Sequence, residues 1–177
     1  RLQKQGHQVV RLPRALLGQI SKLKEFCHKN KPDYILHLAT AGNYNTKVAI
    51  EEIININLLG TFNILNALIN IPYKKFINFS TSSVRLQRQT FYSASKAGAE
   101  KLCMAFFQEY NKPVVTLRPY TVIGRGEQEN HLIPTLIRSC LEGELMPFVA
   151  EPVHDFIDVS DVVNAVLLIA EKGNPEE

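Results

Sequence analysis

The feature that most constrains the fold is a regular alternation of short apolar runs with longer helical stretches. The runs YILHLA, KKFINFST, PVVTLR and DFIDV have the length of strands, and a stretch of helical length separates each from the next. Runs that are apolar throughout are typical of strands buried on both faces of a parallel sheet. Right-handed crossovers then place helices on both sides of that sheet. The sequence therefore predicts an α/β fold with a doubly wound parallel sheet.

The boundaries of the elements follow from capping and turn residues. Gly6 is expected to end a helix that occupies the first residues, QVVRL (8–12) to form a short buried strand, and Ser21 to cap a helix that ends near Asn30. Ser160 or Asp161 is expected to cap the last helix. Further helices are expected over 53–71, 91–110 and 132–141.

Composition excludes several classes of protein. A chain of 177 residues with 45% hydrophobic and 21% charged residues fits one domain over 1–177, and no linker is visible. The 20 basic and 17 acidic residues are scattered, so nucleic acid is not an expected partner. The most apolar run, 53–71, contains five asparagines, which argues against a membrane span. No membrane partner is expected.

The cysteines and histidines do not predict a metal site. Cys27, Cys103 and Cys140 lie far apart, each in an expected helix, and are interpreted as reduced core thiols of a cytoplasmic protein. His37 lies within an apolar strand, where a buried hydrogen bond is expected, and no second ligand follows at metal-site spacing.

Chemistry is suggested by FYSASKAGAEKL, in which Tyr92 precedes Lys96 by four residues at the start of a helix. Residues i and i+4 of a helix face the same way, about 6 Å apart, so the ammonium can favour the ionised phenol. Such a tyrosine can transfer protons near neutral pH. The spacing alone is also compatible with two solvated side chains on a helix surface.

Hydroxyl groups follow the strand that precedes this helix. The segment FSTSS places Ser80 to Ser83 at the carboxyl end of a strand, the edge where ligands of doubly wound sheets bind. A polar turn would explain these residues equally well in isolation. The order of strand, hydroxyl cluster, YxxxK helix and a strand that ends in LRP is more specific than either motif alone.

In this order the chain resembles the extended short-chain dehydrogenase/reductase family, the NAD(P)-dependent epimerases and dehydratases of nucleotide sugars. The resemblance rests on GHQVVRL, PDYILHLAT, NLLGTFNIL, KKFINFSTSSV, YSASK, VVTLRPYTVIG and HDFIDVSDVVNAV. It implies a Rossmann-like fold with Tyr92 as catalytic acid/base, Lys96 as its partner and ligand of the nicotinamide ribose, and Thr81, or the adjacent Ser82, on the reacting oxygen. It further implies cofactor contacts from Arg14, Leu38, Ala39, Thr40, Ala41, Asn57, Phe79, Ser80, Pro119 and Tyr120, and substrate contacts from Ser82, Ser83, Thr121 and Arg125.

The chain also departs from the family pattern. It contains no GxxGxxG, the turn that binds the pyrophosphate, and it starts and ends inside the region that the family covers, so a fragment lacking the first strand and much of the substrate region is expected. Pro13 stands where NAD-binding members carry an acid, and Arg11 and Arg14 lie nearby, which favours NADP over NAD unless both arginines are solvated. Arg118 could bridge loops or contact a diphosphate.

The expected reaction is proton and hydride transfer on a nucleotide sugar. Dehydratases of the family resemble one another in an acidic pair after the threonine, where this chain has Ser82 and Ser83, so an epimerase or a reductase is favoured. A non-catalytic nucleotide-binding relative is the alternative. The resemblance also implies a homodimer through the YxxxK helix, where Ala94, Ala97, Gly98 and Ala99 would allow close helix approach.

Overall fold

The computed structural model describes residues 2–43, 47–145 and 154–173, and its strands are all parallel to their partners. Strands β1 (Tyr34–His37), β2 (Lys75–Phe79) and β3 (Val114–Leu117) form one sheet in the order β1-β2-β3. Strands β4 (Thr121–Ile123) and β5 (Phe156–Asp158) form a second sheet. The parallel α/β architecture predicted from the sequence is confirmed.

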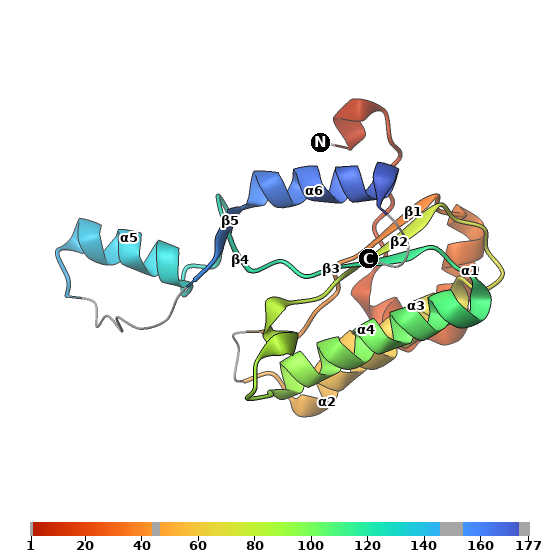
Figure 1. Ribbon diagram of the computed structural model, residues 1–177, viewed down its shortest axis with the longest axis horizontal. Coiled ribbons are helices and arrows are strands. Elements are labelled where there is room, and N and C mark those ends of the chain that lie inside the picture. The colour runs from red at the N-terminus through yellow and green to blue at the C-terminus, as the bar shows by residue number, and fades with distance from the viewer. Residues whose placement is uncertain (1, 44–46, 146–153, 174–177) are drawn as a thin grey trace.

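Helices cover both faces of the three-stranded sheet. α1 (Ile20–Asn30), α3 (Gly60–Ala67) and α4 (Phe91–Tyr110) lie on one side, and α6 (Val159–Lys172) lies on the other (Figure 1). α5 (Leu132–Glu142) projects away from the sheet (Figure 1). The remaining helical segments are α2 (Ile50–Ile54), the π-helical η3 (Asn55–Leu59) and the 3-10 turns η1 (Gln3–Gln5), η2 (Arg14–Gly18) and η4 (Ser82–Arg85).

The hydrophobic core lies between the sheet and the layer of α1, α3 and α4. Phe76 of β2 is completely buried and packs in one cluster with Leu65 of α3 and Cys103 of α4. Side chains of a strand alternate between its faces, so Lys75 points to the opposite side, toward α6. Its ammonium donates to the carbonyl oxygens of Ile169 at 3.0 Å and Gly173 at 2.6 Å, which attaches the end of α6 to the sheet.

The long asparagine-rich helix contains a wide turn that the sequence did not predict. α2, η3 and α3 follow one another without a break from Ile50 to Ala67, and the N–H of Gly60 donates to the carbonyl of Asn55, five residues earlier. A π turn of this kind is rare and frequently occurs at functional sites. Here it contains Asn57, which is completely buried.

Several local expectations were wrong. QVVRL forms no strand, and Val9 and Val10 are about half exposed, because none of the described strands lies beside this segment to complete a ladder. The helix that Ser21 was expected to cap instead begins at Ile20, with Gln19 in the cap position after η2. β4, which pairs with β5, was not predicted from the sequence.

Gly6 does end its short helix, with φ of 85°. The cap of α6 is Asp158, whose carboxylate accepts from the Ser160 N–H at 2.7 Å, and not Ser160 or Asp161. Cys27 and Cys103 are buried free thiols, but Cys140 is exposed, because α5 projects from the core. Within the described ranges, no helix has the length and apolar character to cross a membrane.

Candidate active site

The start of α4 is fixed by a capping box, which determines where Tyr92 lies. The Thr90 hydroxyl accepts from the Ser93 N–H at 3.1 Å, and the Ser93 hydroxyl accepts from the Thr90 N–H at 2.8 Å. These two bonds satisfy donors that a helix start otherwise leaves without partners. Tyr92 is therefore held in the first turn of α4, where it is half-buried.

Lys96 lies one turn further along and is directed into the protein. Its side chain is buried, with 2% of the residue exposed, and its ammonium donates a hydrogen bond to the Phe79 carbonyl at the carboxyl end of β2. Burial lowers the pKa of Lys96 to about 8, although Cys103 and Glu100 act in the opposite direction. The lysine of the YxxxK motif is thus a buried group at the sheet edge and not a solvated one.

The hydroxyl cluster lies at the same edge. Thr81 caps η4: its hydroxyl accepts from the Ser83 N–H at 3.2 Å and donates to the Ser83 hydroxyl at 3.2 Å. The N–H of Ser80 donates to the Leu117 carbonyl at 2.8 Å, and that of Ser82 to the Pro119 carbonyl at 3.3 Å. The backbone after β2 therefore stays joined to the backbone after β3.

Asn57 connects the loop after β1 to the first turns of α4. Its side chain accepts from the Ala41 N–H at 2.8 Å and donates to the Ala41 carbonyl at 3.0 Å and the Ser95 hydroxyl at 3.0 Å. The Ser95 hydroxyl in turn donates to the carbonyl of Tyr92 at 2.8 Å. Three chain segments that meet at the sheet edge are thereby held by one buried amide.

His37 satisfies a buried hydrogen bond, as expected. The Thr61 hydroxyl donates to the Asn57 carbonyl at 2.7 Å and has one proton, so it accepts from His37 Nε2 at 2.9 Å. Burial and then the charge of Lys96 lower the pKa of His37 to about 3, so the ring is neutral at neutral pH. Among the described residues, no group of three or more His, Cys, Asp or Glu could hold a metal ion.

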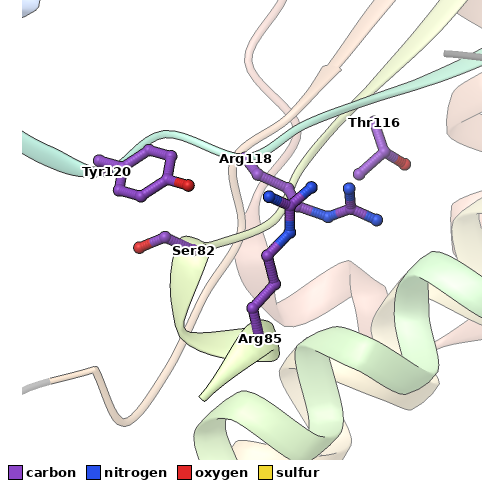
Figure 2. Close-up of a pocket in the computed structure, with 5 residues that line it drawn as sticks. All are labelled: Ser82, Arg85, Thr116, Arg118 and Tyr120. Carbon is purple, nitrogen blue, oxygen red and sulfur yellow. The ribbon is translucent and has the colours of Figure 1, made fainter.

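A cavity of about 150 Å³ opens beside η4 and the end of β3. Figure 2 shows Arg85 rising from η4 beside Arg118, with Ser82 and Tyr120 on the other side of the cavity. Ser82 and Tyr120 are thus brought together, as expected for residues at one sheet edge. Thr121, the first residue of β4, and Arg125, between Gly124 and Gly126, are not among the residues that line it.

Two predicted cofactor contacts, Arg14 and Leu38, are not among the residues that line this cavity. Arg14 forms an exposed ion pair with Glu52, at 2.9 Å, so its charge already has a partner. Leu38, just beyond β1, is 57% exposed. Ala39 and Thr40 follow it in the described part of the loop, whereas positions 44–46 of the loop predicted to carry the site lie outside the described residues.

The sequence analysis did not single out Glu100, and it left Arg118 with two alternative roles. Glu100 lies one turn after Lys96 on α4, and its carboxylate accepts from Arg118 Nε and Nη2, both at 2.7 Å. Arg118 therefore bridges α4 and the end of β3. The i, i+4 spacing of Tyr92, Lys96 and Glu100 is visible in the sequence and places all three on one face of the helix.

Comparison with known proteins assigns the family. A model described as the NAD dependent epimerase/dehydratase family matches residues 1–177. The chain belongs to this family. The expected family resemblance is therefore confirmed, together with the fold that it implied.

Curated relatives are similar over most of this chain but are much longer. It is 27% identical to dTDP-D-glucose 4,6-dehydratase of Dictyostelium discoideum, covering 85% of this chain and 41% of that protein. It is 29% identical to the trifunctional UDP-glucose 4,6-dehydratase/UDP-4-keto-6-deoxy-D-glucose 3,5-epimerase/UDP-4-keto-L-rhamnose-reductase of Arabidopsis thaliana, covering 80% of this chain and 24% of that protein. The chain thus spans less than half the length of either relative.

Solved structures show the same fold. UDP-glucuronic acid 4-epimerase from Bacillus cereus, in complex with UDP-glucuronic acid and NAD, matches with a TM-score of 0.78 and 21% identity, over 98% of this chain and 60% of that one. UDP-glucose 4-epimerase from Thermotoga maritima, with UDP-glucose, matches with a TM-score of 0.79 and 23% identity, over 89% of this chain and 58% of that one. At these identities the likeness shows the fold alone.

Proposed function

We propose that this chain forms the nicotinamide-facing part of a nucleotide-sugar epimerase or reductase, with Tyr92, Lys96 and Thr81 as its catalytic residues. The observation that carries the proposal is the burial of the Lys96 ammonium against the Phe79 carbonyl. Lys96 lies one helical turn after Tyr92, and Phe79 lies two residues before Thr81. Lysine is almost never fully buried in a protein unless its charged group has a partner. Family membership supports this choice of residues.

Each catalytic residue has a defined task in this proposal. The Tyr92 phenolate removes the proton of a sugar hydroxyl, and the Lys96 charge stabilises the phenolate. The Thr81 hydroxyl donates to the reacting oxygen, giving up its present bond to Ser83. A bound nicotinamide would accept the hydride from the carbon that carries this oxygen, which leaves a ketosugar as a transient or final product. Ser82, Ser83, Thr121 and Arg125 remain the proposed substrate contacts.

The residues present fit one end of such a cofactor. Exposed Leu38 offers an apolar surface at the carboxyl end of β1, where dinucleotides bind in doubly wound sheets. Asn57 holds the Ala41 backbone in place beside it. Leu38, Ala39, Thr40, Ala41, Phe79, Ser80, Lys96, Pro119 and Tyr120 would hold the nicotinamide half, with Asn57 as their support.

We propose NAD as the cofactor, in place of the NADP that the sequence favoured. Glu52 pairs with Arg14 and so competes for the cation that was expected to bind the 2′-phosphate. The solved relatives include complexes with NAD. Calorimetric titration with NAD and with NADP tests this choice, and tighter binding of NADP would overturn it.

The test of the reaction is the turnover of UDP- and dTDP-sugars with NAD by the protein that carries this chain. Tyr92→Phe removes the phenol oxygen and is expected to lower kcat by about 10²-fold or more. Tyr110→Phe is the matched control, because Tyr110 lies at the other end of α4 and is 48% exposed. Equal turnover by Tyr92→Phe and the control would overturn the assignment.

We also propose a homodimer in which α3 and α4 of one protomer pack on those of its partner. Leu59, the last residue of η3 before α3, and Phe62 of α3 are each 47% exposed, and Met104 of α4 is 43% exposed. Ala99 is fully buried and a side-chain atom at Gly98 would meet Leu58, so these two small residues serve packing within the chain. Phe62→Glu is expected to give monomers in light scattering. Leu168→Glu is the control, because Leu168 is 55% exposed on α6, away from the proposed interface. A monomeric wild-type protein would refute the proposal.

A further inference from the structure

The Glu100–Arg118 ion pair holds α4 against the sheet one turn from Lys96. Its two parallel hydrogen bonds, both 2.7 Å, form the rigid fork arrangement of arginine with carboxylate. The carboxylate side chain is 13% exposed, so solvent screens it less than an ordinary surface pair. The pair joins the helix that carries Lys96 to the end of β3, next to the strand whose Phe79 carbonyl accepts from that lysine.

Among the groups that act on Lys96, Glu100 is the ionised acid that favours its ammonium. Two groups favour the ammonium, Cys103 and Glu100. Burial raises the pKa of the Cys103 thiol to about 12, so this group is neutral at neutral pH. Burial also acts to raise the pKa of Glu100, but Arg118, the nearby Ser80 hydroxyl and Lys96 outweigh it and lower this pKa, so Glu100 is ionised. His37 faces Lys96 from β1 as a neutral ring.

We propose that Glu100 and Arg118 are positioning residues for Lys96: the ion pair fixes the helical turn that carries the lysine against the carboxyl ends of β2 and β3, and the carboxylate supplies the negative charge that keeps the buried ammonium protonated. Arg118 fixes the orientation of the Glu100 carboxylate, so the negative charge stays at one position relative to Lys96. The proposal rests on the proposed function only for its consequence, the tuning of Tyr92. Its physical part concerns Lys96 alone.

The experiment follows the ionisation of Lys96 in protein labelled with ¹³C at lysine Cε, with the signal assigned through Lys96→Arg. In Glu100→Gln the pKa of Lys96 is expected to fall from about 8 to about 7, because an opposite charge nearby contributes one unit or more. Glu100→Asp keeps the negative charge, so most of the fall in the Lys96 pKa should be absent in this variant. Glu109→Gln is the matched control: it removes a carboxylate from the same helix nine residues further on, about 14 Å along the axis.

The outcomes separate this proposal from the proposed function. An unchanged Lys96 titration in Glu100→Gln, or an equal fall in Glu109→Gln, overturns the positioning role. A fall of the Lys96 pKa in Glu100→Gln that is absent in Glu100→Asp supports the positioning role. This holds even if the protein turns over none of the sugars offered, because that result would count against the catalytic assignment only. If the protein is active, the upper limb of its pH–rate profile, where Lys96 loses its proton, should move to lower pH in Glu100→Gln, because loss of the carboxylate lowers the Lys96 pKa.

Discussion

Replacing Asn57 by alanine should destabilise the protein far more than the loss of one side chain of this size on the surface. Asn57 is completely buried and makes three hydrogen bonds, two to the backbone of Ala41 and one to Ser95. Each net contribution is about 1 kcal/mol, and groups left without a partner in the core add to the loss. The free energy of unfolding should therefore fall by about 3 kcal/mol.

Equilibrium unfolding in urea, followed by circular dichroism, measures this loss. With an m value of about 2 kcal/mol/M, the expected change lowers the midpoint by about 1.5 M. Asn30→Ala is the matched control, because the Asn30 side chain makes one hydrogen bond, to the Phe26 carbonyl at 2.7 Å, and should lose no more than about 1 kcal/mol. If the two variants differ by less than about 1 kcal/mol, Asn57 does not hold the three segments together as described.

Three further predictions concern stability. His37 has a pKa of about 3 in the folded protein and about 6.5 in the unfolded chain, so its contribution to the free energy of unfolding is complete above pH 6.5 and is lost as the pH falls toward 3, by up to about 1.4 kcal/mol per pH unit. Chemical denaturation across this range should show a weaker dependence of the unfolding free energy on pH for His37→Gln, and an equal dependence would contradict the assignment. Gly42→Ala, with φ of 80° and Ile53 atoms 2.5 Å from the added carbon, should lower the melting temperature more than Gly6→Ala, with φ of 85° and open space, whereas equal losses would show that Ile53 moves aside. Lys75→Met should increase hydrogen exchange in the last turn of α6, because the Ile169 and Gly173 carbonyls lose their donor, whereas exposed Lys74→Met should leave it unchanged; equal exchange in both would exclude the anchor.

The parallel sheet and the position of the candidate site could be predicted from the sequence because their signals are local. The runs of β1, β2 and β3 are mostly apolar, and α4 was predicted with its observed bounds of Phe91 and Tyr110. The convergence of Thr81 and Lys96 follows from strand order alone, since parallel strands place their carboxyl ends at one edge. The roles of these residues remain predictions.

What the sequence did not reveal depends on contacts between distant segments. QVVRL has the composition of a strand, but strand formation needs a neighbour, and propensity is overridden where none is present. The wide turn at Asn55 has no sequence signature. The pairing of Arg118 with Glu100 joins residues 18 positions apart and becomes visible only when α4 packs beside β3. Arg14 illustrates the same limit, because Glu52 is 38 positions away.

The π turn in η3 sets the rotational phase of the helix that contains it. One extra residue in a turn rotates everything before it by about 100° relative to everything after it. Removing a single residue between Asn55 and Leu59 would restore an ordinary helix while swinging Ile53, now buried beneath Gly42, out of its place. Length changes in this region should consequently be far harder to accommodate than substitutions, since no exchange of side chains can turn a helix back around its own axis.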